Sequence, residues 1–349
     1  MSTHTNQNES IIKFIAACSV IFIHASPPGN IGMVLDCIAR FSVPFFFAIS
    51  GYYAYKADLT TLFRRLKKII ILLIVACIIY LLWDMWYVYF FTDGSIINCI
   101  TELFTAKRMA RALFMDWNPL SDHLWYLHAI IGVYFIMILY QILKSSINTL
   151  DNTPLYIFSA CAFLFQIAFG MKVVGAKMEM PYLIYRNSLF FGLPMFSLGM
   201  LIHECGRYIS ESLKLTNKKV FVLVILGFGL SLLQWFGLGE VEMPLGMLLV
   251  TFITIMYIDQ NAPSTSRSDA WLFRGWLDSS SKNIYILHVL IINVIEAYYD
   301  ENCYFSSPEE YKMFLPFIVL ALSIILSLVL VMIRNILIKI KNHNNTQYE

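Results

Sequence analysis

Apolar residues occupy most of the chain in long runs separated by short polar segments, beginning with IIKFIAACSVIFIHASPP at residues 11–28. A helix needs about 20 apolar residues to cross the hydrocarbon core of a bilayer. The pattern therefore predicts ten membrane spans, of which the first, fifth and eighth are short: 10–26, 33–55, 67–91, 123–143, 155–170, 182–203, 220–239, 243–258, 283–299 and 313–335. We expect an all-α, polytopic transmembrane helix bundle that forms one domain over residues 1–349, with a short polar tail at 342–349.

Composition supports this class. The chain is 58% hydrophobic and only 14% charged, whereas a soluble domain usually has about 25% charged residues. The net charge of +2 does not favour a nucleic-acid partner. Cys18, Cys37, Cys77 and Cys161 lie in apolar runs without a CxxC pair or zinc spacing, so we expect small buried side chains rather than metal ligands.

Basic residues orient the predicted spans. With the N-terminus in the cytoplasm, sixteen of the 25 Lys and Arg fall in cytoplasmic segments and six in external loops. This positive-inside bias predicts that both termini are cytoplasmic. The remaining three, Lys13, Arg40 and Arg186, lie inside predicted spans. Such cations are costly and often mark a functional pathway. The structural alternative is pairing with an intramembrane acid, for which Asp36, Asp84 and Glu296 are available. Asp36 and Arg40 are four residues apart, so this pair is expected to be partly self-neutralising.

Lys13 and His24 share one face of the first predicted span. Eleven residues turn a helix by about 1,100°, within about 20° of whole turns, and separate the two side chains by about 16 Å along the axis. An imidazole can act as a general base near neutral pH, although a lone His on an apolar helix is more often a packing residue. The pair suggests a site that takes an activated group from a phosphorylated carrier on the cytoplasmic side and delivers it deeper in the membrane.

The longest external loop, 92–122, contains KRMARALFMDW. This amphipathic stretch is expected to lie at the membrane interface, to cover an outward-facing cleft, or to be an ordinary solvated helix. His123 and His128 are five residues apart, about 140° around a helix, so they do not form a metal pair on one face. No HExxH, Asp-rich pair or GxSxG is present.

Five segments resemble, in order, the motifs of the acyltransferase family 3 membrane proteins. They are the Lys13-to-His24 spacing, ARFSVPFFFAISGYYAY (39–55), FRRLKKI (63–69), DHLWYLHAII (122–131) and SKNIYILHVLI (281–291). HASPP, RFSVPFFFAISGYY and YRNSLFFGLPMFSLGMLI (185–202) are most similar to a subgroup that includes the membrane domains of vancomycin-resistance serine racemases. Neither a racemase domain nor an SGNH hydrolase-like domain is expected within this chain.

The resemblance implies a membrane-bound O-acyltransferase of the bacterial cytoplasmic membrane. It would move an acyl group, most often acetyl, from cytoplasmic acetyl-CoA to a hydroxyl of a cell-envelope glycan or lipid-linked sugar. Acetyl-CoA would be a co-substrate, and no bound cofactor or metal is implied. The expected partners are acyl-CoA, the glycan or lipid-linked acceptor and the bilayer, with a homodimer left open.

The same resemblance assigns residues to roles. His24 would be the catalytic base or a transient acyl acceptor. The acyl donor would be bound by Lys13, Arg40, Arg64, Arg65, Ser50, Tyr285 and His288. The acceptor or the cavity would be lined by Tyr52, Trp125, Tyr126, Arg186 and Asn187. Trp125, Tyr126 and Tyr285 are also explained by an interfacial aromatic belt, and Arg64 and Arg65 by the positive-inside rule.

Two other classes remain open. Intramembrane charges also line transport paths, so the chain is alternatively a transporter of an amino acid or sugar derivative. Transporters often contain internal repeats, and none is evident between residues 1–170 and 171–349. A sensory or scaffold membrane protein without catalysis is the third possibility.

Overall fold

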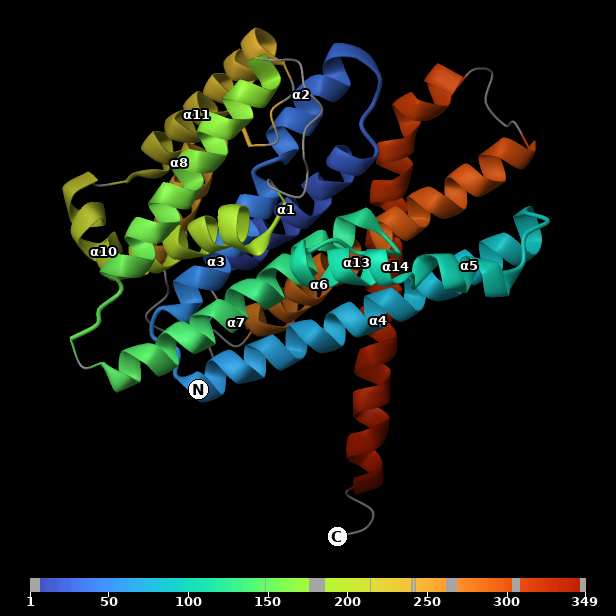
Figure 1. Cartoon of the computed structure of the whole chain (residues 1–349), viewed down its shortest axis with the longest axis horizontal. Coiled ribbons are helices and arrows are strands. Elements are labelled where there is room, and N and C mark those ends of the chain that lie inside the picture. Colours follow the sequence, from blue (N-terminus) through green and yellow to red (C-terminus); the bar gives the residue numbers. More distant parts are fainter. Residues whose placement is uncertain are drawn as a thin grey trace. The chain divides into compact units, whose positions relative to one another are not determined.

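The computed structural model describes residues 7–147, 149–175, 186–213, 215–239, 241, 243–261, 269–302 and 308–345. These residues form helices and turns without a strand (Figure 1), which confirms the all-α prediction. The chain divides into two compact units, Met1–Ser42 with Asn261–Glu349, and Val43–Gln260. Each unit is described separately below.

Seven segments among the described residues are long and apolar enough to cross a membrane: Gly29–Ala54, Leu59–Phe91, Asp122–Ser146, Thr153–Gly170, Ser188–Gly206, Asn217–Leu238 and Glu310–Ile340. They correspond to seven of the ten predicted spans and indicate a multi-pass membrane protein. The predicted spans 10–26, 243–258 and 283–299 coincide with helices that are shorter or more polar. The count of ten and the cytoplasmic termini stay predictions.

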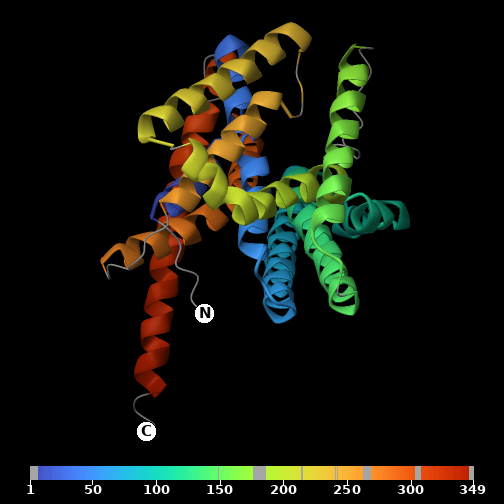
Figure 2. The ribbon, with the colours of Figure 1, turned by 90° about the vertical axis from the view of Figure 1, so that its left-hand side faces the viewer.

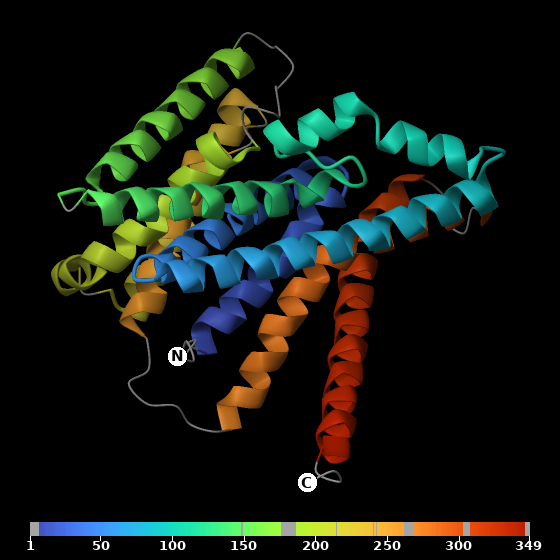
Figure 3. The ribbon, with the colours of Figure 1, turned by 60° about the horizontal axis from the view of Figure 1, so that its bottom comes forward.

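The first unit consists of α1 (Gln7–His24), α2 (Gly29–Ala39), α13 (Asp269–Asn302) and α14 (Pro308–Asn345). α1 packs along α13 and also contacts α2 and α14, while α13 packs on α14 (Figures 2 and 3). Aromatic pairs hold these contacts: the rings of Phe14 and Trp276 are 5.6 Å apart, and those of Phe22 and Phe317 are 5.8 Å apart. Trp276 is on α13 and Phe317 is on α14, so α13 supports α1 near Lys13 and α14 supports it near His24.

The predicted span 33–55 is not one continuous helix. α2 ends at Ala39, residues 40 and 41 form a turn, and α3 (Ser42–Ala54) begins beyond it. In a continuous helix the carbonyl of Arg40 would accept from the N–H of residue 44, but Pro44 has none and its ring clashes with that carbonyl. Ser42 Oγ instead donates to the carbonyl of Ala39 at 2.7 Å. The break follows from one proline that a hydropathy average does not register.

The predicted ends of two other elements also change. α14 extends to Asn345, so the polar tail predicted at 342–349 starts within a helix. The span predicted to begin at residue 182 is described only from Arg186, with a π-helical turn, η2 (Ser188–Gly192), before α10 (Leu193–Leu213). Residues 182–185 and 346–349 lie outside the described part of the chain.

The second unit contains most of α3 and the helices between it and residue 260. These are α4 (Leu59–Phe91), α5 (Ile96–Leu103), α6 (Ala106–Phe114), η1 (Asp122–Leu124), α7 (Trp125–Ser146), α8 (Thr153–Gly175), η2, α10, α11 (Asn217–Leu238) and α12 (Leu245–Gln260). α4 lies along α7, α10 packs against α8 and α12, and α11 packs on α12 (Figure 1). Fully buried side chains such as Phe47, Val133 and Phe196 form the core.

Two glycines allow α3 and α10 to cross with their backbones in contact. A Cβ on Gly51 would lie 1.8 Å from the carbonyl oxygen of Phe196, and one on Gly199 would lie 1.7 Å from that of Ala48. Small residues at such crossings let membrane helices approach closely. The glycine of the SGYY sequence therefore fixes the part of α3 that carries Ser50 and Tyr52.

The amphipathic helix expected in the external loop is present as α6. Leu113 and Phe114 at its end are 78% and 84% exposed, and Lys107 and Arg111 are exposed as well. Figure 3 shows α5 and α6 following the end of α4. Apolar and basic side chains exposed on one short helix are typical of an interfacial element.

The cysteines are only partly as expected. Cys37 is buried, whereas Cys161 is exposed on α8. The prediction that Cys161 is buried is therefore wrong. A thiol behaves as a small apolar group, so an outward position on a membrane-spanning helix carries no penalty.

Candidate active site

His24 and His288 lie side by side in the first unit. His24 is the last residue of α1 and is exposed, whereas His288 on α13 is completely buried. Their ring centroids are 5.2 Å apart, and the Tyr285 ring is 6.3 Å from that of His288. The structure thus brings together three predicted site residues from opposite ends of the chain, with one imidazole accessible and the other behind it.

The buried histidine has a defined tautomer. Its Nδ1 atom is 3.0 Å from the carbonyl oxygen of Ile284 and 2.9 Å from that of Tyr285. Carbonyl oxygens only accept hydrogen bonds, so Nδ1 must carry the hydrogen. In the neutral ring the lone pair is then on Nε2. His288 therefore presents a basic nitrogen, held in place by the backbone of its own helix.

Lys13 and Arg40 each form an ion pair with an acid one helical turn earlier. The ammonium of Lys13 contacts Glu9, whose side chain is fully buried, while that of Lys13 is 22% exposed. Arg40 bonds Asp36 through Nε at 3.1 Å and through a terminal nitrogen at 3.2 Å. The expected Asp36–Arg40 pair is confirmed. Glu9 was not among the expected partners, because it lies just outside the predicted span.

Ser50 and Tyr126 come together in the second unit. Ser50 Oγ donates to the carbonyl of Phe46 at 2.8 Å, which leaves its oxygen free to accept. The side chains of Tyr126 and Tyr134 both hydrogen-bond Ser50, and Tyr134 also bonds Arg65. Tyr134 was not predicted from the sequence; it lies in the apolar middle of the span, where an aromatic residue gives no sign of a polar contact.

Tyr52 belongs to a different cluster. Its hydroxyl donates to the carboxylate of Asp259 on α12, and its ring centroid is 4.6 Å from that of His203 on α10. His203 also lies 5.2 Å from Tyr55. The sequence offered one sign of this cluster: His203 and Asp259 are both polar residues at the ends of predicted spans.

Trp125 is part of the hydrophobic core. It is 8% exposed, and its ring lies 5.7 Å from Phe191 and 6.4 Å from Phe47. Neither an interfacial belt nor direct exposure to a cavity accounts for this packing. Its position favours a role in holding the adjacent Tyr126.

Arg186 and Asn187 stabilise the start of η2. Arg186 pairs with Asp122 at 2.8 Å. The side-chain oxygen of Asn187 accepts hydrogen bonds from the N–H groups of Leu189 and Phe190, at 2.9 and 2.7 Å. Such capping satisfies donors that a helix start leaves open. Asp122, not an acid on the predicted list, is the partner of Arg186.

Comparison with known proteins decides the family. Residues 10–334, nearly the whole chain, match the family model of acyltransferase family 3, an acyltransferase domain. The chain belongs to acyltransferase family 3. No curated protein and no solved structure matches it. The resemblance seen in the sequence is thereby confirmed at the level of the family, while the serine racemase-like subgroup stays a prediction.

Basic side chains of this acyltransferase cluster at the start of α4. Arg64, Lys67 and Lys68 are exposed, and Arg65 is partly buried. The helix begins at Asp58, whose carboxylate accepts from the N–H of Thr61 at 3.0 Å. That hydrogen bond, together with the nearby Arg64, lowers the pKa of Asp58. Cations near a helix N-terminus oppose the helix dipole, so this cluster is not explained by helix stability.

The described residues of the acyltransferase contain no group of three or more His, Cys, Asp or Glu that could hold a metal ion. His123 contacts Ser121 at 2.7 Å and Tyr80 at 3.4 Å. His128 contacts Asn118 at 3.0 Å. Both histidines are thus engaged in hydrogen bonds that tie the 115–124 segment to α4 and α7.

Proposed function

We propose that this family 3 acyltransferase moves an acetyl group from cytoplasmic acetyl-CoA to a hydroxyl of a cell-envelope glycan or lipid-linked sugar. It would act in the bacterial cytoplasmic membrane. The observation that carries the proposal is the pairing of the exposed His24 with the buried His288. An accessible imidazole supported by a second one is suited to removing a proton from a hydroxyl near neutral pH.

The chemistry needs one proton transfer and one acyl transfer. His24 takes the proton of the acceptor hydroxyl, whose oxygen attacks the thioester carbonyl. The carbon–sulfur bond breaks, and the leaving CoA thiolate takes the proton back from the imidazolium. The alternative order, in which His24 is acylated first, uses the same residue as nucleophile.

His288 would orient His24 in either order. Its Nε2 carries the lone pair because Nδ1 donates to backbone carbonyls. An N–H of His24 turned toward that nitrogen leaves the other nitrogen of His24 basic, as a second group does for histidine in many active sites. Tyr285, one turn before His288, supplies one of those carbonyls and packs near the ring. This favours a positioning role for both over the donor-binding role.

For the CoA phosphates, the structure favours α4 over α1. Arg64 is exposed beside Lys67 and Lys68, and guanidinium groups bind phosphate oxygens in pairs. Lys13 and Arg40 are also assigned to the donor, but Glu9 and Asp36 already offset their charges. An anionic ligand at either residue must compete with a carboxylate.

For the acceptor, Ser50, Tyr52 and Tyr126 present hydroxyl groups of the kind that bind sugars. Ser50 and Tyr126 act together, since they are hydrogen-bonded to each other. Trp125 and Asn187 act by positioning, because one is in the core and the other caps η2. Arg186 is the remaining assigned contact, with Asp122 as its counter-charge.

The decisive experiment uses the full chain in lipid vesicles with radiolabelled acetyl-CoA and a hydroxylated acceptor. His24→Ala should lower acetyl transfer by about 10²–10⁴-fold, the usual contribution of a general base. Ser19→Ala is the matched control, because Ser19 lies on the same helix and its hydroxyl donates to the carbonyl of Ile15, a local contact within that helix. Wild-type transfer by His24→Ala would refute the assignment.

The same vesicles separate an enzyme from a transporter. An acyltransferase releases CoA thiol in step with acetylated product, whereas a carrier moves substrate across the membrane without thiol release. Mass spectrometry of envelope glycans from deletion and complemented cells then identifies the acceptor. Unchanged acetylation of every envelope glycan in the deletion strain would argue against this acceptor class.

A further inference from the structure

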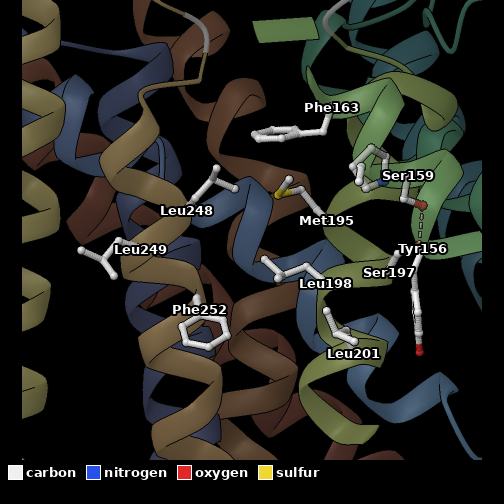
Figure 4. A pocket seen from close by; sticks show the side chains of 12 residues that line it. Tyr156, Ser159, Phe163, Met195, Ser197, Leu198, Leu201, Leu248, Leu249 and Phe252 are labelled. Atoms are coloured by element: carbon white, nitrogen blue, oxygen red, sulfur yellow. Dashed lines mark hydrogen bonds between the residues drawn. The ribbon is translucent and has the colours of Figure 1, made fainter. Parts of the chain in front are cut away.

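The second unit contains an apolar groove between α8, α10 and α12, with a volume of about 370 Å³ (Figure 4). Side chains such as Phe163, Met195, Leu198, Leu248 and Phe252 line it. Its only hydroxyls besides that of Tyr156 are those of Ser159 and Ser197, which bond each other at 2.8 Å. The interior therefore offers hydrocarbon and no free polar group to a ligand.

The groove opens where the bilayer surrounds the protein. α8 and α10 are among the segments able to span a membrane, and α12 is a shorter apolar helix. Ala160 on α8 is exposed at the edge of the groove, and Leu201 on α10 is 39% exposed. Water is not stable in an apolar space of this kind, so a hydrocarbon chain from the bilayer is the natural occupant.

The depth of the groove matches part of one leaflet. The lining residues of α8 run from Tyr156 to Phe163, which is about 10 Å along a helix axis. One leaflet contributes about 15 Å of hydrocarbon. The groove thus accepts most of one acyl chain that enters from the Tyr156 end, and it is too short for a long polyprenyl chain.

The Tyr156 end carries charges of both signs. Tyr156 donates a hydrogen bond to the carboxylate of Glu204 at 2.7 Å and also bonds Asn152. The ammonium of Lys144 donates to Asn152 Oδ1 at 3.1 Å. One polar network therefore places a cation and an anion at the entrance of an apolar groove. By the positive-inside prediction, this entrance faces the cytoplasm.

We propose that the groove binds one acyl chain of a zwitterionic glycerophospholipid, with the phosphate near Lys144 and the ammonium of the headgroup near Glu204. The two-sign entrance complements such a headgroup. A long-chain acyl-CoA fits less well, because Glu204 would face its phosphates. The packing of α8 against α10 and α12 would then depend on the lipid that one leaflet supplies.

The test uses the full chain in vesicles of phosphatidylethanolamine and phosphatidylglycerol, with a trace of phosphatidylethanolamine that carries a diazirine in its acyl chain. After irradiation, mass spectrometry locates the labelled peptides. We expect label on residues 156–163 and 194–201. Ala160→Trp should reduce that label about tenfold, since displacing two methylene groups costs about that factor.

Cys161→Trp is the matched control. Cys161 is an adjacent small residue that is exposed on α8 and does not line the groove, so its label should be unchanged. Leu201→Trp provides a second obstruction from α10, and circular dichroism shows whether each variant is folded. Glu204→Gln should reduce the preference for the ethanolamine probe over a phosphatidylglycerol probe.

Three results would overturn the proposal. The first is label spread evenly over all lipid-facing helices, and the second is unchanged labelling in both folded Trp variants. The third is displacement of the probe by palmitoyl-CoA or a polyprenyl phosphate at equal mole fraction, which would identify the acyl donor or a lipid-linked acceptor as the occupant. Labelling needs no turnover, so its result is independent of whether the proposed acetyl transfer is correct.

Discussion

Replacing Gly51 by alanine tests the crossing that positions the polar residues of α3. The added Cβ would lie 1.8 Å from the carbonyl oxygen of Phe196, and real Cβ atoms essentially never approach another atom within 3.0 Å. α3 and α10 must therefore separate by about 1.2 Å. The obstacle is backbone, so no side-chain rotation relieves the contact.

Overpacking of this kind costs about 1–3 kcal/mol. Because the obstacle is backbone, we expect the cost to lie in the upper part of this range, about 2–3 kcal/mol, which exceeds the gain of about 1 kcal/mol that alanine brings over glycine inside a helix. We therefore expect Gly51→Ala to lower the free energy of unfolding by a net value of about 1–2 kcal/mol, measured by denaturant titration in detergent micelles. Acetyl transfer should fall as well, because Ser50 and Tyr52 flank the crossing.

Gly229→Ala is the matched control, since nothing lies within 4 Å of the Cβ that it would add on α11. Its free energy of unfolding should be unchanged or higher by up to about 1 kcal/mol. If Gly51→Ala and Gly229→Ala had the same stability, α3 and α10 would not cross in the way described, and the reasoning would fail.

Two further predictions concern polar contacts. Burial raises the pKa of Asp116, although a hydrogen bond from the N–H of Ser188 opposes the shift. Folding thus favours the neutral form of Asp116. The contribution of this carboxyl group to folding stability is complete below about pH 3.9 and is lost as the pH rises through the folded-state pKa. Asp116→Asn keeps an acceptor oxygen and tolerates the φ of 53°, but it cannot ionise. Its free energy of unfolding relative to wild type should therefore increase between about pH 4 and pH 7. A constant difference across that range in denaturant titrations would contradict this. Tyr52→Phe removes the donor to Asp259 and should lower the free energy of unfolding by about 1–3 kcal/mol. The loss should be smaller when Asp259 is already replaced in Asp259→Asn. Additive losses in this double-mutant cycle would show that the two side chains do not interact.

Much of the helical framework could be predicted from the sequence because bilayer thickness sets the length of an apolar run. Each of the ten predicted ranges overlaps helix within the described residues, although only seven of the helical segments are long and apolar enough to count as spans. Hydropathy averaged over 33–55 missed the break at Arg40, since a single Pro44 decides the backbone there. A hydropathy average indicates whether a whole segment can lie in lipid, whereas a break in a helix depends on single residues.

The candidate site was predictable only where its geometry is local. The positions of Lys13 and His24 on one helix follow from helical periodicity, and α1 is continuous between them. The contact of His24 with His288 depends on α1 packing along α13, which no spacing in the sequence reveals. The Tyr52–Asp259 bond joins α3 to α12 in the same long-range way. For His24 and His288 the family resemblance supplied the residues, and the structure supplied their contact.

The ion pairs change how the cations inside the predicted spans are interpreted. Lys13 and Arg40 drew attention as costly charges, and the structure places an acid one turn before each of them, Glu9 on the same helix as Lys13 and Asp36 on the helix that Arg40 caps. An i,i+4 partner enters the membrane together with the cation, so each pair reduces its own insertion cost. Their presence is then explained without a ligand, and the charge count alone no longer indicates a CoA site on α1. The histidines are not explained in this way, because an exposed imidazole against a buried one neutralises no charge. The case for catalysis in the first unit therefore depends on His24 and His288, and the case for phosphate binding depends on the exposed cations of α4.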